Sequence, residues 1–313
     1  MISSLTAILK KILFLDFFVH LAYCLFSFWG LTILIKELKW SLYKEYILVF
    51  FLSMPSFGMW TSVISKEAFT CFFTCIALVW LVNLFEKKPL RFSVFLNLIS
   101  LYIIIIMRPT VGVGLLLLII ILYYFKITFI NKYVRFLSII LTVFISSIIV
   151  YNLANKYIKD EFLPLAEAYF DPSSFSSTST RKFGFWKSAS DLFLKAPQGI
   201  FIANLGPTLP ESINKPYFMP YFLEGMLFII TMIYLISAII FKQLFRDTIN
   251  PNFVMFLLFG VILILFMNYP FGLFNPGSAT RYRSSYYHII IVGLLYFYYK
   301  EKSYFKMKNL IKD

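Results

Sequence analysis

Acidic residues are scarce in this chain of 313 residues, with 15 Asp and Glu against 29 Lys and Arg, and only 14% of all residues are charged. Soluble domains carry more charge than this, so the shortage excludes an ordinary soluble fold. Cysteine occurs only three times, at Cys24, Cys71 and Cys75, always within apolar stretches. With no further Cys or His at metal-ligand spacing, these cysteines are predicted to be core residues that form neither a metal site nor a disulfide.

Several familiar reaction centres are also missing from the sequence. It contains no GxSxG nucleophile turn, no HExxH zinc motif, no GxxxxGK[ST] phosphate loop and no GxGxxG after a strand. An acidic DxD-type pair, which would indicate a metal-bound nucleotide sugar, does not occur either. We therefore expect no cofactor and no metal.

Long apolar runs are what the chain does contain. Hydrophobic residues make up 60% of the sequence, aromatic residues make up 20%, and the mean hydropathy is +0.80. This composition predicts an all-α integral membrane protein, a single membrane domain over 1–313. About nine runs approach the ~20 residues that a bilayer core requires. The predicted spans are 12–35, 46–64, 68–85, 92–107, 109–125, 134–154, 221–241, 253–274 and 286–299. The first span lacks a small-residue cleavage site, so we do not expect a removable signal peptide.

The fourth and fifth spans meet at Arg108 and Pro109. A single helix from Phe92 to Phe125 would be about 51 Å long at 1.5 Å per residue, which is too long for one crossing and short for two. Pro109 removes a backbone donor, and Arg108 would be costly at the middle of a bilayer. These residues predict a broken helix pair.

The net charge of +14 is distributed over short loops, as in membrane proteins, and requires no nucleic-acid partner. Alternate loops and the C-terminal tail hold more than half of the basic residues, and the positive-inside rule makes that side cytoplasmic. The segment 155–220 is the only sizeable polar region, and on this topology it is an external, periplasmic loop. Its prolines favour extended, turn-rich chain over regular helix.

Charged residues in the predicted external turns are the candidate site. Arg281 and Arg283 lie in a predicted turn between two apolar runs, where an uncompensated cation is expensive and an anionic partner is favoured. Guanidinium matches phosphate oxygens, so a lipid phosphate or pyrophosphate is the first ligand to consider. Further cations predicted on this face are Arg108, Lys66 and Arg181, and the carboxylates that could take a proton from an attacking hydroxyl are Glu67, Glu211 and Glu224. The alternative is that these charges are only solvated or reach the headgroups as single side chains.

Four stretches carry a resemblance to a known class. They are Met54-Pro55-Ser56 through Trp60 to Ser65-Lys66-Glu67, the break Met107-Arg108-Pro109, Ala196 to Gly199 with Leu205-Gly206-Pro207 and Glu224, and Asn275-Pro-Gly-Ser-Ala-Thr-Arg281-Tyr-Arg283. Together these stretches resemble O-antigen and capsular polysaccharide repeat-unit polymerases of the Wzy type. The chain departs from that class in being short, with fewer spans than many such proteins.

The resemblance implies a membrane glycosyltransferase of the bacterial inner membrane. It implies joining of oligosaccharide units carried on undecaprenyl pyrophosphate at the outer face, with external arginines engaging the anionic carrier. Membrane lipids and a chain-length regulator protein are the implied partners. One alternative is a GT-C-type glycosyltransferase that takes a single sugar from a polyprenyl phosphate. A second alternative is a lipid-linked glycan flippase, although internal repeats and charges within spans, which such a transporter predicts, are not evident.

Overall fold

The computed structural model describes residues 2–86, 88–89, 92–126, 181, 190–246, 251–273 and 275–310. Within these ranges the protein is all-helical, and no strand occurs. The α-helices are α1 (Ile2–Leu13), α2 (Asp16–Leu38), α3 (Leu42–Leu52), α4 (Pro55–Ser62), α5 (Lys66–Glu86), α6 (Val94–Met107), α7 (Pro109–Lys126), α10 (Asp191–Leu194), α11 (Ala196–Leu205), α12 (Leu209–Asn214), α13 (Met219–Arg246), α14 (Pro251–Gly272) and α15 (Pro276–Leu310). A short 3₁₀ helix, η2 (Pro216–Phe218), precedes α13.

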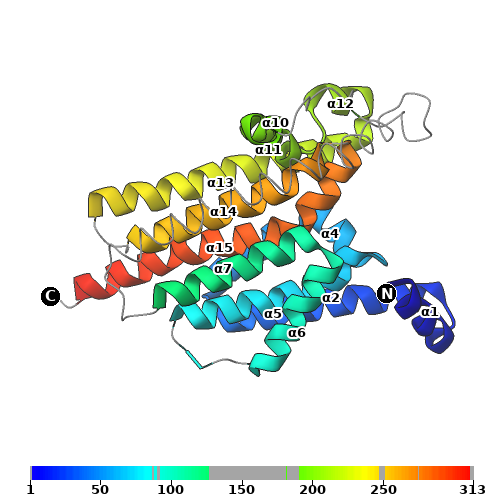
Figure 1. The fold of residues 1–313 in the computed structure, drawn as a ribbon, viewed down its shortest axis with the longest axis horizontal. Coiled ribbons are helices and arrows are strands. Elements are labelled where there is room, and N and C mark those ends of the chain that lie inside the picture. The colour runs from blue at the N-terminus through cyan, green and yellow to red at the C-terminus, as the bar shows by residue number, and fades with distance from the viewer. Residues whose placement is uncertain are drawn as a thin grey trace.

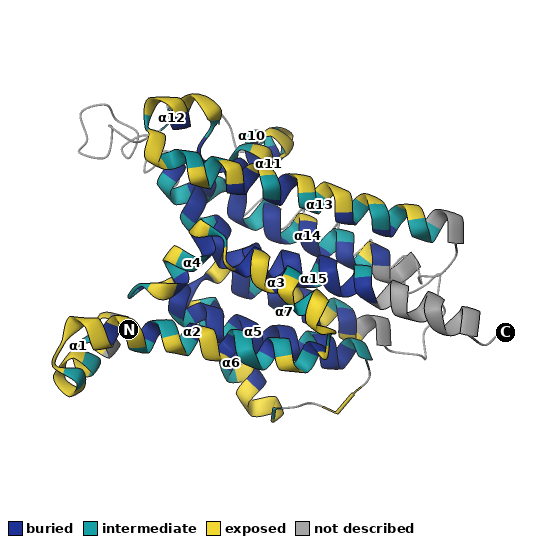
Figure 2. Cartoon of the chain, turned by 180° about the vertical axis from the view of Figure 1, so that it is seen from behind, coloured by how far each residue is buried: buried dark blue, intermediate teal, exposed yellow. Residues whose placement is uncertain are grey.

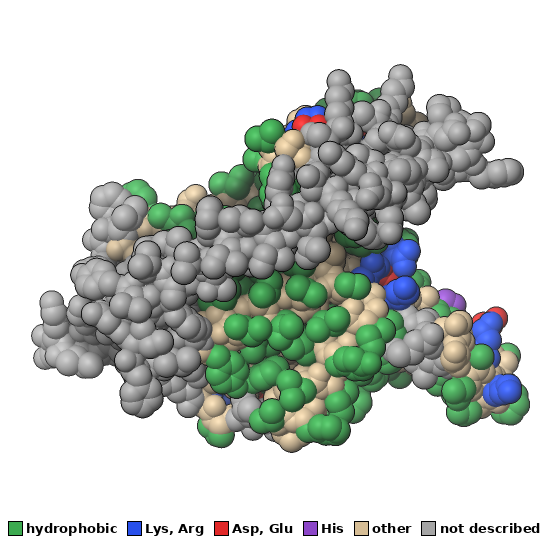
Figure 3. All heavy atoms as spheres, in the orientation of Figure 1, with side chains coloured by type: hydrophobic (Ala, Val, Ile, Leu, Met, Phe, Trp, Pro, Cys, Tyr) green, Lys and Arg blue, Asp and Glu red, His purple; other side chains and the backbone are tan. Residues whose placement is uncertain are grey.

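Four stretches in the described chain are long and apolar enough to cross a membrane, judged by length and composition. They are Asp16–Leu38, Lys66–Glu86, Pro216–Gln243 and Val254–Gly272. The apolar helices α6 and α7 are shorter. Large apolar side chains such as Trp29, Tyr102 and Ile262 are exposed on these helices, and Figure 3 shows an apolar face on one side of the bundle. These features support a helical membrane protein.

The long helices lie side by side along the long axis of the molecule (Figure 1). At one end lie α4 and the short helices α10, α11 and α12, and at the other end lies the C-terminal part of α15. We call these the α12 end and the C-terminal end. At the C-terminal end, Trp40 packs edge-on against Tyr299, and the hydroxyl of Tyr296 donates to Glu86 at 2.7 Å. The bundle therefore has two chemically distinct ends.

The centre of the bundle is formed by α5 and α15. Buried residues are concentrated along both helices (Figure 2). On α15 the stretch Tyr286–Leu295 contains only buried residues apart from Gly293. The outer helix α2 packs closely on α5, since a Cβ at Gly30 would lie 2.6 Å from the Cα of Phe72. Residues at the N-terminal ends of α5 and α15 are thus held at fixed positions at the α12 end.

Two predicted spans are wrong, because each is interrupted and covers parts of two helices. The predicted span 46–64 is two helices, because Pro55 begins α4 and disfavours helical backbone at the residue before it. The predicted span 12–35 is interrupted at Phe14, which has a φ of 58°. Lys10 and Lys11 lie in the last turn of α1 and Asp16 lies in the first turn of α2, so the charges favour two separate helix ends.

Two predicted irregular regions are helical instead. The turn predicted to hold Arg281 and Arg283 belongs to α15, whose first turn is capped where the Ser278 amide donates to Asn275 Oδ1 at 2.6 Å. The proline-rich part of 155–220 forms α11, α12 and η2, because its prolines occupy first helical turns, where a missing amide costs nothing.

Other predictions from the sequence are confirmed or lie outside the described residues. The helix break at Arg108 and Pro109 is confirmed, with α6 ending at Met107 and α7 beginning at Pro109. Helices are also confirmed within 68–85, 221–241 and 253–274. The predicted span 134–154 and most of the predicted loop 155–220 lie outside the described residues.

The separation of the two ends predicts opposite labelling by a membrane-impermeant thiol reagent. Asn214, exposed at the α12 end, and Ser41, exposed beyond α2, are replaced singly by cysteine in a chain whose three native cysteines are changed to alanine. In intact cells the Asn214→Cys chain is expected to react, and the Ser41→Cys chain is expected to react only after permeabilisation. Labelling of both positions from the same side would refute the topology.

Candidate functional site

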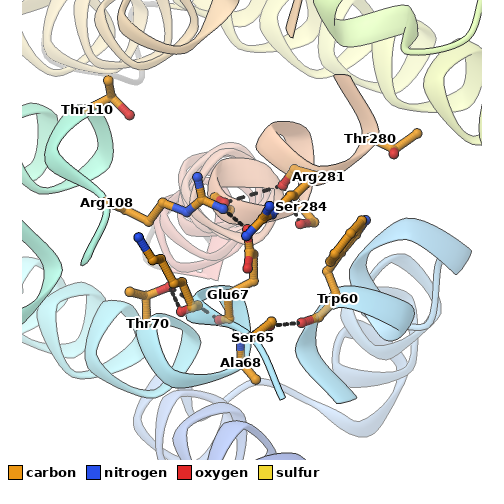
Figure 4. A network of polar contacts seen from close by, with 12 residues as sticks. Trp60, Ser65, Glu67, Ala68, Thr70, Arg108, Thr110, Thr280, Arg281 and Ser284 are labelled. Carbon is orange, nitrogen blue, oxygen red and sulfur yellow. Dashed lines mark hydrogen bonds and ion pairs between the residues drawn. The ribbon is translucent and has the colours of Figure 1, made fainter. Parts of the chain in front are cut away.

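The carboxylate of Glu67 lies between two guanidinium groups at the α12 end (Figure 4). It forms ion pairs with Arg108 and with Arg281, whose Nε donates to Glu67 Oε1 at 2.6 Å. Glu67 is 2% exposed and Arg108 is 7% exposed, whereas the Arg281 side chain is 41% exposed. We call these three residues the arginine centre, and Arg281 is its exposed member.

Local sequence fixes Glu67 at the start of α5. The side chain of Ser65 accepts a hydrogen bond from the Ala68 amide at 3.1 Å and donates to the Trp60 carbonyl at 2.7 Å. Ser65 thus caps α5, which begins at Lys66, and ties its start to the end of α4. Glu67 therefore lies in the first turn, where a carboxylate is favoured by the helix dipole.

The helix break places Arg108 inside the bundle. Arg108 caps α6 with a φ of −140° and a ψ of 77°, and its amide still donates to the Ile104 carbonyl at 2.7 Å. A Cβ at Gly112 would lie 2.6 Å from the Ile105 backbone nitrogen, so glycine is what allows α7 to pack closely on α6 after the break. The Arg108 side chain thus reaches Glu67 from the break between α6 and α7.

Aromatic rings flank both arginines. The guanidinium carbon of Arg281 lies 5.2 Å from the centroid of the Trp60 ring, and that of Arg108 lies 4.7 Å from the centroid of the Tyr282 ring. Rings at these distances attract a cation and exclude water from one side of it. Burial lowers the pKa of the Arg108 guanidinium from its ordinary value, but an arginine remains protonated at neutral pH.

The arginine centre carries more positive than negative charge. Two guanidiniums share one carboxylate, and Lys66 is exposed at the adjacent position on α5. In and beside the arginine centre, Arg108 Nε, Trp60 Nε1 and Glu67 Oε2 are buried without a hydrogen-bond partner among the described residues. Unpaired buried donors beside an excess cation favour binding of an oxyanion.

Arg283 occupies a different place from Arg281. It is fully buried, and its guanidinium forms an ion pair with Glu224 at 3.4 Å. Nη1 donates to the carbonyls of Asn204 and Leu205 at 2.8 and 3.1 Å, and Nη2 donates to the Tyr221 carbonyl at 3.1 Å. We call the Arg283–Glu224 pair the buried clasp. The hydrogen bonds that Arg283 donates all go to α13 and the end of α11, and its Nε is buried without a hydrogen-bond partner among the described residues.

The buried clasp also fixes the start of α4. Glu224 Oε2 accepts from the Ser56 amide at 2.7 Å, and Oε1 accepts from the Ser56 hydroxyl. A carboxylate at this position completes the first turn of α4, the helix that carries Trp60. The buried clasp is therefore linked through α4 to one wall of the arginine centre.

The last two predicted site residues, Arg181 and Glu211, form an ion pair that anchors the short helices. Arg181 Nε and Nη2 donate to the two oxygens of Glu211 at 2.8 and 3.0 Å, and Nη1 donates to the Gly272 carbonyl at 3.1 Å. Burial acts to raise the pKa of Glu211, but hydrogen bonds from Arg181 and from the Thr208 amide, with the Arg181 charge, hold it below its ordinary value. Glu211 also caps α12 with Thr208.

The structure thus divides the predicted site residues into three groups. Glu67, Arg108 and Arg281 converge, with Lys66 exposed beside them, while Arg283 with Glu224 and Arg181 with Glu211 form two separate internal pairs. Sequence reasoning did not assign a role to Trp60 or Tyr282. Their position offered a signal, since Trp60 lies just before the Ser65–Glu67 stretch and Tyr282 lies between the two arginines.

A second unforeseen grouping involves His288. Ligand atoms of Cys71, Cys75 and His288 all lie within 4.8 Å of one another, although the spacing of the cysteines in the sequence predicted no metal site. His288 Nε2 also lies 2.6 Å from the Thr74 hydroxyl, so the ring is held from α5. Thiol and imidazole are ligands that zinc and copper accept, and here they occur together inside the bundle.

The buried clasp makes a stability prediction. Glu224→Ala leaves the Arg283 charge without its carboxylate in a fully buried position, at an expected cost of about 3–5 kcal/mol. Asp16→Ala is the matched control, because Asp16 pairs with Lys10 at the surface, where such pairs contribute about 0–1 kcal/mol. Thermal unfolding of the purified variants in detergent measures both. Equal unfolding temperatures for the two variants would contradict the role of the clasp.

No protein-family model matches this chain, and neither the curated proteins nor the solved structures contain a match to it.

Proposed function

We propose that this protein is a membrane glycosyltransferase that polymerises oligosaccharide repeat units carried on undecaprenyl pyrophosphate, in O-antigen or capsule biosynthesis. The observation that carries the proposal is the arginine centre. It combines excess positive charge, buried donors without partners and a carboxylate at one end of an apolar bundle. The pyrophosphate of such a lipid would pair with the excess positive charge of the arginine centre. Its hydrocarbon chain suits an apolar helical bundle in a membrane.

In the proposed reaction the arginines bind the leaving group. A hydroxyl of the incoming lipid-linked unit attacks the anomeric carbon of the growing chain, and the bond from that carbon to the pyrophosphate oxygen breaks. The pyrophosphate departs with the electron pair and one more negative charge on its oxygen. Arg281 and Arg108 stabilise this charge, which develops in the transition state.

Glu67 receives the hydroxyl proton in this scheme. Among the three predicted carboxylates it is the one paired with the arginines that would hold the substrate, since Glu224 and Glu211 are held by Arg283 and Arg181. Before substrate binds, Glu67 neutralises one of the two guanidiniums. A bound pyrophosphate competes for them and releases the carboxylate to act on the acceptor.

The proposal also includes a membrane topology with more spans than the four candidate spanning helices. We propose a multi-pass protein of the bacterial inner membrane with about nine spans and the α12 end facing outward. The segment 155–220 then lies on the same side as the arginine centre, where Arg181 and Glu211 anchor its described part. Lipid-linked units would meet the centre at the outer face of the membrane.

Complementation of a deletion strain tests the proposal. Electrophoresis of the surface glycan should show a polymer ladder with the wild-type gene, and only the single-unit product in the deletion strain. At matched protein levels Arg281→Lys keeps the charge but loses paired donors, at about 1–3 kcal/mol, so the ladder should weaken by about fivefold to a hundredfold. Arg281→Ala should be weaker still.

Two controls separate substrate binding from folding. Lys36→Ala changes an exposed cation at the C-terminal end and should leave the ladder intact. Arg283→Lys alters the buried clasp and should lower protein abundance instead of activity per molecule. Full activity of Arg281→Ala would remove Arg281 from the reaction, and a deletion strain with an unchanged ladder would refute the polymerase.

A further inference from the structure

Two thiols and an imidazole meet between the central helices α5 and α15. Cys71 and Cys75 lie one turn apart on α5, His288 lies on α15, and all three residues are buried. Their ligand atoms lie within 4.8 Å of one another. Some point therefore lies within about 2.8 Å of all three atoms, against bonds of about 2.3 Å to thiolate and about 2.0–2.1 Å to imidazole in zinc sites. Side-chain movements of less than about 1 Å would close a metal site here.

The His288 ring has hydrogen-bonding capacity that the protein does not fill. Nε2 lies 2.6 Å from the Thr74 hydroxyl, which itself donates to the Cys71 carbonyl at 2.9 Å. Nδ1 is buried without a hydrogen-bond partner among the described residues. Because Thr74 keeps its backbone acceptor, a metal ion could bind Nε2 in its place without leaving an unpaired hydroxyl. A buried imidazole that is only partly satisfied, beside two thiols, points to a bound ligand.

These three residues lie on the helix faces that carry the arginine centre. Cys71 and Cys75 follow Glu67 at spacings of four and eight residues on α5, and His288 follows Arg281 at a spacing of seven residues on α15. At 1.5 Å per residue, Cys71 lies roughly 6 Å along α5 from Glu67. By the same measure, His288 lies roughly 10 Å along α15 from Arg281. One ion bound to both helices would therefore hold the two sides of the arginine centre together.

We infer that Cys71, Cys75 and His288 bind one thiophilic metal ion, with Cu(I) favoured over Zn(II). Thiolate ligands select these two ions, and imidazole suits both of them. Three ligands complete the coordination of Cu(I), whereas a structural Zn(II) takes four. Each thiol loses its proton to solvent when the ion binds. Two thiolates with Cu(I) carry one net negative charge, which the excess positive charge of the arginine centre partly offsets. The ion is structural and takes no part in the proposed sugar transfer.

Metal titration of the purified full-length protein in nanodiscs tests the inference. Cu(I), kept reduced and buffered by a coloured competing chelator, should bind at one ion per chain and more tightly than Zn(II). Cys71→Ala and Cys75→Ala should each weaken Cu(I) binding at least about a hundredfold, because loss of a ligand costs more than the roughly 10–100-fold loss caused by removing an outer partner. Cys24→Ala is the matched control, because Cys24 lies on α2 outside the group, and it should bind Cu(I) as the wild type does.

A measurement on the loaded wild type keeps the test independent of how the variants fold. X-ray absorption at the copper edge should show two sulfur neighbours and one nitrogen neighbour around the ion. A wild type that binds neither ion, a copper shell without two sulfurs, or equal Cu(I) affinity in all three cysteine variants would overturn the site. Tighter binding of Zn(II) than of Cu(I) would overturn the choice of metal alone.

Discussion

The shared carboxylate of Glu67 is the interaction on which the α12 end of this protein depends. Three chain segments that are distant in sequence meet there, the start of α5, the break between α6 and α7, and the first turns of α15. Leaving a buried arginine without its anion costs about 3–5 kcal/mol, so Glu67 stabilises buried Arg108 and partly exposed Arg281 close to each other at the end of an apolar bundle. One carboxylate for two guanidiniums also leaves the arginine centre with a net positive charge. The pyrophosphate of the proposed substrate would neutralise that charge.

The other two ion pairs build the surroundings of the arginine centre. The buried clasp of Arg283 and Glu224 joins α15 and α13 to the start of α4, and α4 carries Trp60 against Arg281. Glycine makes this close packing feasible, because a Cβ at Gly225 would lie 2.6 Å from Arg283 Nη1. Arg181 and Glu211 anchor the short helices at the same end. Neighbouring arginines, Arg281 and Arg283, thus differ in role because α15 turns them toward different partners.

Much of the helical organisation followed from the sequence because apolar length and proline position are local signals. The break at Arg108 and Pro109 was predictable because a proline and a charge coincide there. The helical start of α15 was missed although Asn275 and Pro276 are a typical cap and first residue. For the site, the sequence indicated Glu67, Arg108 and Arg281 by charge. It could not separate Arg281 from Arg283, because which helix faces meet is decided by packing between distant segments.

The central claim is that Glu67 and an anionic ligand compete for the same two guanidiniums, and calorimetric titration of the purified protein with inorganic pyrophosphate measures it. Glu67→Gln preserves the shape of the side chain but removes its charge. Removing a carboxylate about 6 Å from the anion is worth on the order of 1–3 kcal/mol near a protein surface, so the variant should bind pyrophosphate about tenfold more tightly or better, while forming no polymer. Unchanged or weaker binding by Glu67→Gln, in a variant that folds normally, would contradict the account.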